Sequence, residues 1–101
     1  MVRRSFDPVL LERLRNLDCA RVLAVLDGHF KQDRTFVPVK NKSTQRWHCC
    51  TVRGDFELLI TGSKWFDTRQ HKGGGGAIDL VMALTGCSFV DAVRVLMDGG
   101  L

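Results

Sequence analysis

The stretch that decides the fold runs from Lys64 to Met82 and reads KWFDTRQHKGGGGAIDLVM. Its first residues include two neighbouring aromatic side chains and are typical of a short β-strand. Four consecutive glycines follow at 73–76, where we expect a sharp turn that passes close to a helix. The apolar residues after them predict a helix at 77–85. The stretch therefore predicts a strand that a glycine-rich turn joins to a helix.

The residues before this stretch continue the β pattern. Arg46–Val52 and Asp55–Thr61 are rich in aromatic, β-branched and cysteine residues, and the Arg-Gly pair between them is a hairpin signal. Thr35–Val39 is a further short β-like run, which its proline confines to a sheet edge. We therefore predict an antiparallel meander of three or four strands within residues 34–68.

Helical patterns flank this meander on both sides. Asp7-Pro8 predicts a helix start, because Asp caps helices well and proline is tolerated at the first helical position. Asp18 predicts a second start, so two short helices fill residues 7–27. After the glycines, helices are predicted at 77–85 and 88–97, the last opened by a capping-box variant. The predicted fold is α+β: a small antiparallel β-meander flanked by two N-terminal and two C-terminal helices.

Length and composition fit one small domain. The chain has 101 residues, of which 45% are hydrophobic and 26% are charged, close to the average for globular proteins. Its longest apolar runs have five residues, far below the roughly 20 that a membrane helix needs. Four cysteines without a recognisable leader are typical of reduced thiols. We expect a single cytoplasmic domain over residues 1–101, without membrane association.

Basic residues are concentrated in the middle of the chain. The net charge is +4, but the segment from Lys31 to Lys72 holds nine basic and four acidic residues, which gives +5 there and −1 elsewhere. A local excess of this kind attracts polyanions, nucleic acid above all, because each contact with a phosphate releases counterions. The alternative is a solvated surface that is rich in lysine.

Catalytic signatures are missing from the sequence. The only histidines are His29, His48 and His71, none beside a recognisable nucleophile, and no pair of carboxylates has catalytic character. We therefore expect no enzyme activity from this chain alone.

The glycine tetrad has two interpretations. Glycines before a helix can offer free N–H groups to a phosphate at the positive end of the helix dipole. This makes Gly74, Gly75 and Gly76 candidates for a weak phosphate contact, although the Lys-Ser/Thr of a P-loop is missing. The steric interpretation is that a sharp turn passing close to a helix accepts only glycine.

His48, Cys49, Cys50 and His71 offer soft ligands that a zinc ion could use. A structural zinc site uses two closely spaced ligand pairs, and here the second pair has only His71. Cysteines in a strand are most often small buried hydrophobes. We therefore expect no metal ligands and no cofactor, and a zinc-dependent regulator that uses these four residues is a third alternative.

The Lys64–Met82 stretch, followed by CSFVDAVRVL at 87–96, resembles the N-terminal zinc-ribbon domain of bacterial DNA primases. Those domains carry an aromatic pair, a Cys-x-x-Cys, a glycine-rich turn, Ala-Ile-Asp-Phe and a Phe-x-x-Ala-Val helix. The chain is more similar to the zinc-poor relatives found ahead of Toprim domains in primase-like proteins of plasmids and other mobile elements. The resemblance covers about half the chain, from Arg46 to Leu96, and the glycine-to-helix segment is its specific part.

The resemblance also places the metal ligands of the family on this sequence. They fall on Cys50 and Arg53 and on Thr68 and His71, and neither Arg53 nor Thr68 is a good zinc ligand. The resemblance therefore implies a zinc-ribbon-like fold without metal, held together by an apolar core. The residues available for that core are Trp47, Phe56, Leu58, Ile60 and Phe66.

In primases this domain helps to read the single-stranded template and takes no part in phosphoryl transfer. The resemblance implies a non-catalytic domain that binds single-stranded DNA in replication of a mobile element, beside a Toprim, helicase or relaxase protein. Basic groups among aromatic platforms hold single strands, and strand alternation places Lys64 and Phe66 opposite a more buried Trp65. The candidate nucleic-acid-binding residues are Lys40, Lys42, Arg46, Arg53, Lys64, Phe66, Arg69 and Lys72.

A protein-interaction module is the alternative from another class. Such a module would dock onto a replication or mobilisation protein through Leu10 and Leu14, or through the helix that carries Val93 and Leu96. Salt-sensitive binding of DNA would favour the nucleic-acid interpretation over this one.

Overall fold

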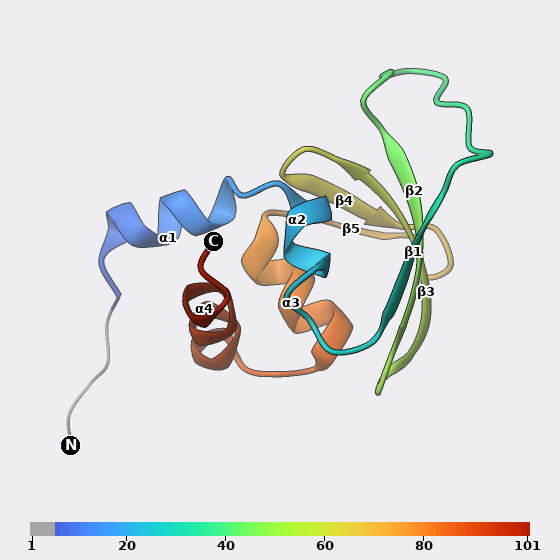
Figure 1. Cartoon of the computed structure of the whole chain (residues 1–101). Helices are drawn as coiled ribbons and strands as arrows, with labels where there is room; N and C mark the ends of the chain where they lie inside the picture. The colour runs from blue at the N-terminus through green and yellow to red at the C-terminus, as the bar shows by residue number, and fades with distance from the viewer. Residues whose placement is uncertain (1–5) are drawn as a thin grey trace.

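The computed structural model describes residues 6–101 and places five strands and four helices in two layers (Figure 1). The sheet is antiparallel, and each strand pairs with the next one along the chain. This confirms the predicted α+β fold with two N-terminal and two C-terminal helices. The elements are α1 (Pro8–Arg15), α2 (Cys19–Leu23), β1 (His29–Asp33), β2 (Gln45–Thr51), β3 (Gly54–Thr61), β4 (Lys64–Asp67), β5 (Lys72–Gly75), α3 (Ala77–Thr85) and α4 (Phe89–Asp98).

Three helices begin at side-chain caps that the sequence predicts. Asp7 accepts a hydrogen bond from the Val9 amide at 2.9 Å, and Asp18 and Ser88 act in the same way at the starts of α2 and α4. The predicted end of the second helix was wrong. α2 ends at Leu23, because the amides of residues 24–26 bond three residues back instead of four.

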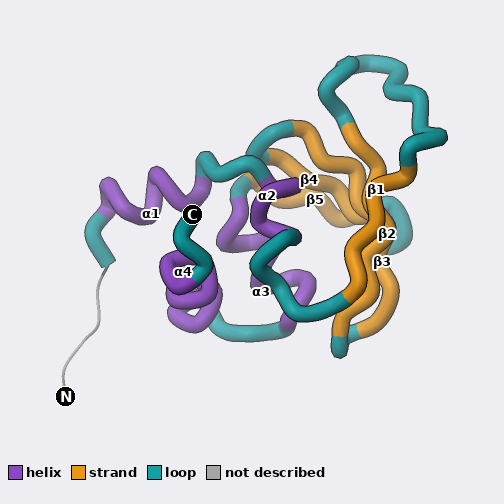
Figure 2. The backbone as a smooth tube through the Cα atoms, in the orientation of Figure 1, coloured by secondary structure: helices purple, strands orange, loops and turns teal. Residues whose placement is uncertain are grey.

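The sheet extends beyond the predicted meander at both ends. β1 and β5 lie outside residues 34–68, so the predicted number of strands, three or four, was too low. The prediction of a strand at Thr35–Val39 was wrong, since this run belongs to the loop at 34–44 between β1 and β2 (Figure 2). Asp33 starts that loop as a turn, because its carboxylate accepts from the amide and the hydroxyl of Thr35.

The first three glycines of the tetrad belong to β5, and the turn that the sequence predicts occurs at the fourth, Gly76. Gly74 lies opposite Trp65 in the β4–β5 register, and a Cβ on Gly74 would be 2.5 Å from Cζ2 of the indole. The reversal toward α3 occurs at Gly76, whose φ of 104° is a conformation that favours glycine. The carbonyl of Gly76 accepts the indole N–H at 3.2 Å. The tetrad therefore lets β5 and the start of α3 close over the indole.

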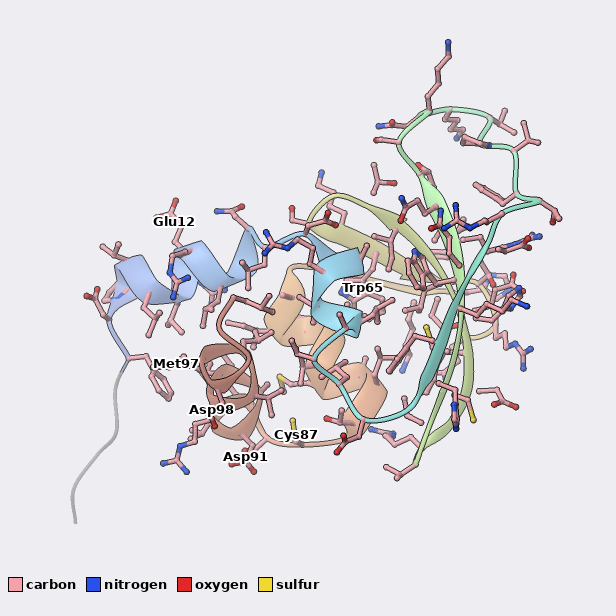
Figure 3. All side chains as sticks on the ribbon, in the orientation of Figure 1. Glu12, Trp65, Cys87, Asp91, Met97 and Asp98 are labelled. Carbon is pink, nitrogen blue, oxygen red and sulfur yellow. The ribbon has the colours of Figure 1, made fainter. Side chains whose placement is uncertain are left out.

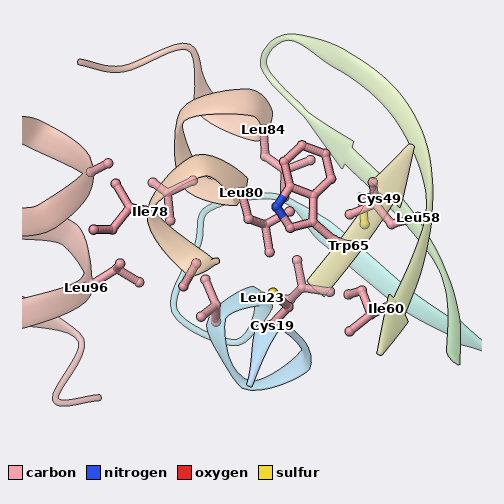
Figure 4. Close-up of a cluster of buried hydrophobic side chains, with 14 of the residues drawn as sticks. Cys19, Leu23, Cys49, Leu58, Ile60, Trp65, Ile78, Leu80, Leu84 and Leu96 are labelled. Atoms are coloured by element: carbon pink, nitrogen blue, oxygen red, sulfur yellow. The ribbon is translucent and has the colours of Figure 1, made fainter. Parts of the chain in front are cut away.

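The core lies between the helices and the inner face of the sheet, where Trp65 is placed among the side chains of α2 and α3 (Figures 3 and 4). Trp65 is buried, which confirms its predicted place opposite Lys64 and Phe66, and Trp47 is partly buried. Phe66 was wrongly assigned to the core, since its side chain lies on the opposite face and is 39% exposed. The buried apolar residues include Leu14, Cys19, Val22, Leu23, Cys49, Phe56, Leu58, Ile60, Ile78, Leu80, Val81, Leu84, Val93 and Leu96.

Among the helices of residues 6–101, none is long and apolar enough to cross a membrane by itself. α3 and α4 reach that length and apolar content only when they are taken together, and the chain bends by 110° between them.

Candidate nucleic-acid interface

The helices lie on one side of β1–β3, which leaves the other side of the sheet open (Figure 1). We call this open side the outer face. Strand alternation decides which side chains it carries, because those that share a face are register partners. They are His29, Lys31, Asp33, Arg46, His48, Cys50, Asp55, Glu57, Leu59, Thr61, Lys64 and Phe66.

A groove of about 670 Å³ lies between the 34–44 loop and the outer face of β3 and β4. We call it the loop groove. The loop contributes apolar groups from Phe36, Pro38 and Val39, and the strands contribute Leu59 and Phe66. The lining also contains two lysines, Lys40 from the loop and Lys64 from β4. The groove thus combines an apolar surface with positive charge.

Phe36 is held in place by a chain of polar contacts. The carboxylate of Asp33 accepts hydrogen bonds from Nε of Arg46 at 2.9 Å and from Nη2 of the same side chain. The guanidinium carbon of Arg46 lies 5.2 Å from the centre of the Phe36 ring, within cation–π range. Hydrogen bonds from Thr35, together with those from Arg46, hold the pKa of Asp33 below its usual range. Arg46 therefore pairs with an ionised carboxylate and positions Phe36.

The ring of Phe66 is partly exposed on the side of the groove that the strands form. The rings of Phe66 and His71 form an edge-type pair with a centroid distance of 6.5 Å and an interplanar angle of 63°. Gly73 is the register partner of Phe66 in β5, and a Cβ there would lie 3.1 Å from Cδ2 of the Phe66 ring. The ring is therefore confined by its neighbours, yet 39% of the residue remains exposed.

The lysines near the loop groove carry uncompensated charge. Lys40, Lys42 and Lys64 are exposed, and none of them forms an ion pair within residues 6–101. Lys42 belongs to the same 34–44 loop as Lys40 but lies outside the groove lining. Four of the predicted contacts, Lys40, Arg46, Lys64 and Phe66, thus gather at or beside one groove.

The other predicted basic residues lie elsewhere. Arg53 is in the β2–β3 turn, at the end of these two strands that is away from the loop groove. Its side chain lies beside Gly86 at the end of α3. Lys72 pairs with Asp67, and Lys64 pairs with Gly75, so the two lysines lie at opposite ends of the β4–β5 ladder. Arg69 lines a separate hollow beside His48, Cys50 and Asp55. Three of the predicted binding residues, Lys64, Arg69 and Lys72, therefore do not gather at one place.

Two of the three glycines predicted as phosphate contacts, Gly74 and Gly76, have internal roles. The Gly76 amide donates to the Ser63 carbonyl at 2.8 Å, so it is not free to meet a phosphate. Gly74 is packed on the Trp65 ring, whereas a Cβ at Gly75 would meet nothing within 4 Å. Packing against Trp65 thus explains the first of these glycines, and the positive φ of Gly76 explains the last.

The four candidate zinc ligands do not converge. Within residues 6–101, no three His, Cys, Asp or Glu side chains are placed to hold a metal ion. Cys49 is on the inner face, where burial, followed by the charge of Asp67, raises its thiol pKa to about 12. His48 and Cys50 are on the outer face, and His71 lies against Phe66.

Of the four residues predicted to form docking faces, three are covered by the chain itself, and the fourth, Leu10, is partly buried. Leu14, Val93 and Leu96 have no exposed surface, because α1, α3 and α4 pack on one another there. These side chains therefore belong to the core and cannot form a surface for a partner.

Sequence reasoning missed Phe36, Val39 and Leu59 as lining residues of the groove. One signal was present for Leu59, since the apolar run 58–60 must place one side chain on the outer face. The apolar run at 36–39 was interpreted as a strand, although it forms part of a loop in which Val37 and Val39 are 78% and 94% exposed.

Comparisons of the chain with protein-family models, with curated proteins and with solved structures find no match. The geometry of the chain is therefore the basis for the function that we propose.

Proposed function

We propose that this chain is a non-catalytic domain that binds single-stranded DNA on the outer face of its sheet. The observation that carries the proposal is the loop groove, where exposed aromatic and aliphatic groups lie beside Lys40 and Lys64. The task is that of the template-binding domain of DNA primases, which the sequence resembles. The proposal includes a role in replication of a mobile element. The domain would act in the cytoplasm, beside a Toprim, helicase or relaxase protein.

The chemistry of the groove suits single strands better than duplexes. A single strand offers the faces of its bases to aromatic side chains, and such stacking contributes about 1–3 kcal/mol per base. In a duplex the base faces are already stacked on one another, and only phosphates and groove edges remain for contact. Phe66 and Phe36 therefore have a use with unpaired bases that they do not have with paired ones.

The apolar surface of the loop also supports a binding role. Val37 and Val39 are largely exposed, and Phe66 is exposed in part. Contiguous apolar groups rimmed by charge commonly mark a binding surface in proteins of this size. The unpaired lysines beside them select an anionic ligand over a neutral or basic protein surface.

A titration with labelled single-stranded DNA, and with a duplex of equal length, tests the proposal. We expect tighter binding of the single strand and a steep loss of affinity between about 50 and 200 mM salt. Equal binding of the two forms would reduce the proposal to a generic basic surface. No binding at low salt would refute it.

A protein-interaction module is the second candidate, supported by a different surface. Val52 is 94% exposed beside a hollow of about 350 Å³ that Val25, Leu26 and Val95 help to line. This hollow lies at the far end of β2 and β3 from the loop groove. The substitution Val52→Asp separates the two candidates, since it would weaken docking of a protein there without changing the affinity for DNA.

A further inference from the structure

We propose that the loop groove receives one unpaired base of the bound strand, held between Phe36 and Phe66, with the adjoining phosphates at Lys40 and Lys64. This inference rests on the proposed function and deepens it. Binding along a basic surface requires only charge, whereas the groove adds a discrete place for one base. The arguments come from the two aromatic walls, the anchoring of the loop, and the charges of the lining.

The two aromatic walls are fixed by independent parts of the fold. Phe66 is held by the β4 register and by its edge contact with His71. Phe36 is held by Arg46, which Asp33 in turn orients. Since both rings are constrained without any ligand, a base that enters between them loses little affinity to reorganisation of the site.

The 34–44 loop is anchored at both ends and carries its apolar groups between the anchors. At one end Asp33 binds the amide and hydroxyl of Thr35 at 2.9 and 2.6 Å. At the other end, the hydroxyls of Thr44 and Thr61 form a hydrogen bond of 2.6 Å. Pro38 restricts the backbone between them. Val37 and Val39 are largely exposed, so their burial stabilises the loop little in the free protein. The anchors at the two ends of the loop therefore maintain the groove.

The charges of the lining select an anionic chain. Lys40 and Lys64 line the loop groove, and no carboxylate does. The hollows beside Arg69, beside Arg34 and beside Val52 each include an aspartate in their lining. Among these four hollows of residues 6–101, the loop groove is therefore the one that places basic side chains against apolar surface without a competing carboxylate.

The polar groups of the lining offer few hydrogen bonds to a base edge. The hydroxyls of Thr44 and Thr61 bond to each other. Oδ1 of Asn41 already accepts from the amide and hydroxyl of Ser43. Recognition of one base over another requires dedicated hydrogen-bond partners. We therefore expect the groove to accept different bases, with affinities that differ only a few-fold.

The experiment compares a short oligothymidylate with an abasic strand of the same length, so that the number of phosphates is constant. We expect the chain to bind the oligothymidylate about tenfold more tightly, a difference of about 1.4 kcal/mol and within the range for one stacked base. Phe66→Ala should lower the affinity for oligothymidylate to that for the abasic strand. It should leave the abasic affinity and the salt dependence unchanged. Val52→Ala, an exposed apolar residue far from the groove, is the matched control.

Phe36→Ala is the second variant, because it removes the opposite wall from a different element of the fold. Thermal unfolding of each variant establishes that it remains folded at the assay temperature. Loss of base discrimination in both variants supports the base groove. Discrimination retained in either folded variant overturns it. Equal affinity of the unmodified chain for both strands, with a steep salt dependence, overturns the base groove but leaves DNA binding intact. No binding of either strand overturns both.

Discussion

The indole of Trp65 lies directly against the backbone of Gly74, so that a Cβ at Gly74 would be 2.5 to 2.9 Å from three atoms of the ring. The two residues are register partners in β4 and β5 on the inner face of the sheet. The indole N–H donates to the carbonyl of Gly76, where α3 begins. One buried side chain therefore joins the last strand and the first C-terminal helix, and the glycine strand exists to admit it.

Gly74→Ala should destabilise the fold by about 1–3 kcal/mol, the usual cost of forcing extra volume into a packed interior. The new methyl group would meet a ring that is buried and hydrogen-bonded, so neither side can move away easily. Urea or thermal unfolding measures the effect. Gly75→Ala is the matched control in the same strand, because a Cβ there meets nothing within 4 Å. Equal stability of the two variants would contradict the role of the Trp65 contact.

The elements that the sequence predicted are those with local signals. Asp7, Asp18 and Ser88 cap helices through bonds to amides two or three residues away, and such contacts are readable from spacing alone. β1 and β5 have no such signal, since one is mostly polar and the other is mostly glycine. Their strand conformation comes from pairing with β2 and β4, which is tertiary information.

The candidate site was predictable only where alternation within one strand decides it. Lys64 and Phe66 share the outer face because they are two residues apart in β4. The count of basic residues along the chain could not reveal that Arg53 lies at the far end of β2 and β3. Phe36 reaches the groove through the path of the 34–44 loop, and no local pattern encodes that path.

Removal of the two groove lysines should change the salt dependence of DNA binding. Each phosphate contact with a single strand contributes about 0.7 to the slope of log K against log salt. The double variant Lys40→Gln and Lys64→Gln should therefore lower the slope by about 1.4, because both side chains line the groove. Titrations with single-stranded DNA at several salt concentrations measure this slope.

The matched control for that variant is Arg53→Gln with Lys72→Gln. It removes the same charge from two positions outside the loop groove, so the slope should change little. If the two double variants lower the slope equally, the strand is held by overall charge and not by the groove.

Asp33→Asn should lower the stability of the fold and make that stability less sensitive to acid. The pKa of Asp33 is lowered by its hydrogen bonds from Thr35 and Arg46, so the ionised form stabilises the folded chain. This contribution is present above the ordinary carboxyl pKa of about 3.9 and is lost as the pH falls through the lower folded value. Urea midpoints between about pH 2 and 7 should therefore fall less steeply in acid for the variant.

The same variant also releases Arg46, and with it the contact that positions Phe36. We expect weaker discrimination between oligothymidylate and the abasic strand at neutral pH, although Phe66 is unchanged. An acid profile identical to that of the unmodified chain would show that Asp33 does not hold Arg46 in solution.

The thiols should separate into two classes on labelling with iodoacetamide at about pH 8 without denaturant. Cys50 is exposed and Cys87 partly so, whereas Cys19 and Cys49 are buried. Burial, with smaller contributions from Asp18 and Asp67, raises the pKa of both buried thiols to about 12. We therefore expect Cys50 and Cys87 to be labelled in the folded chain, with Cys50 slowed by Asp55, which raises its thiol pKa. The buried pair should be labelled only on unfolding, as mass spectrometry of digested samples would reveal.

The raised thiol pKa values also fix the direction of an alkaline effect. Both groups favour the folded chain below the ordinary thiol pKa of about 8.5, and this stabilisation is lost as the pH rises toward about 12. The neighbours Cys49 and Cys50 form the decisive comparison, because alternation places them on opposite faces of β2. Equal labelling rates for the two would mean that the inner face of β2 is open to solvent. Cys49 would then not be separated from His48 and Cys50, and this separation is one reason why these residues cannot hold a metal ion together.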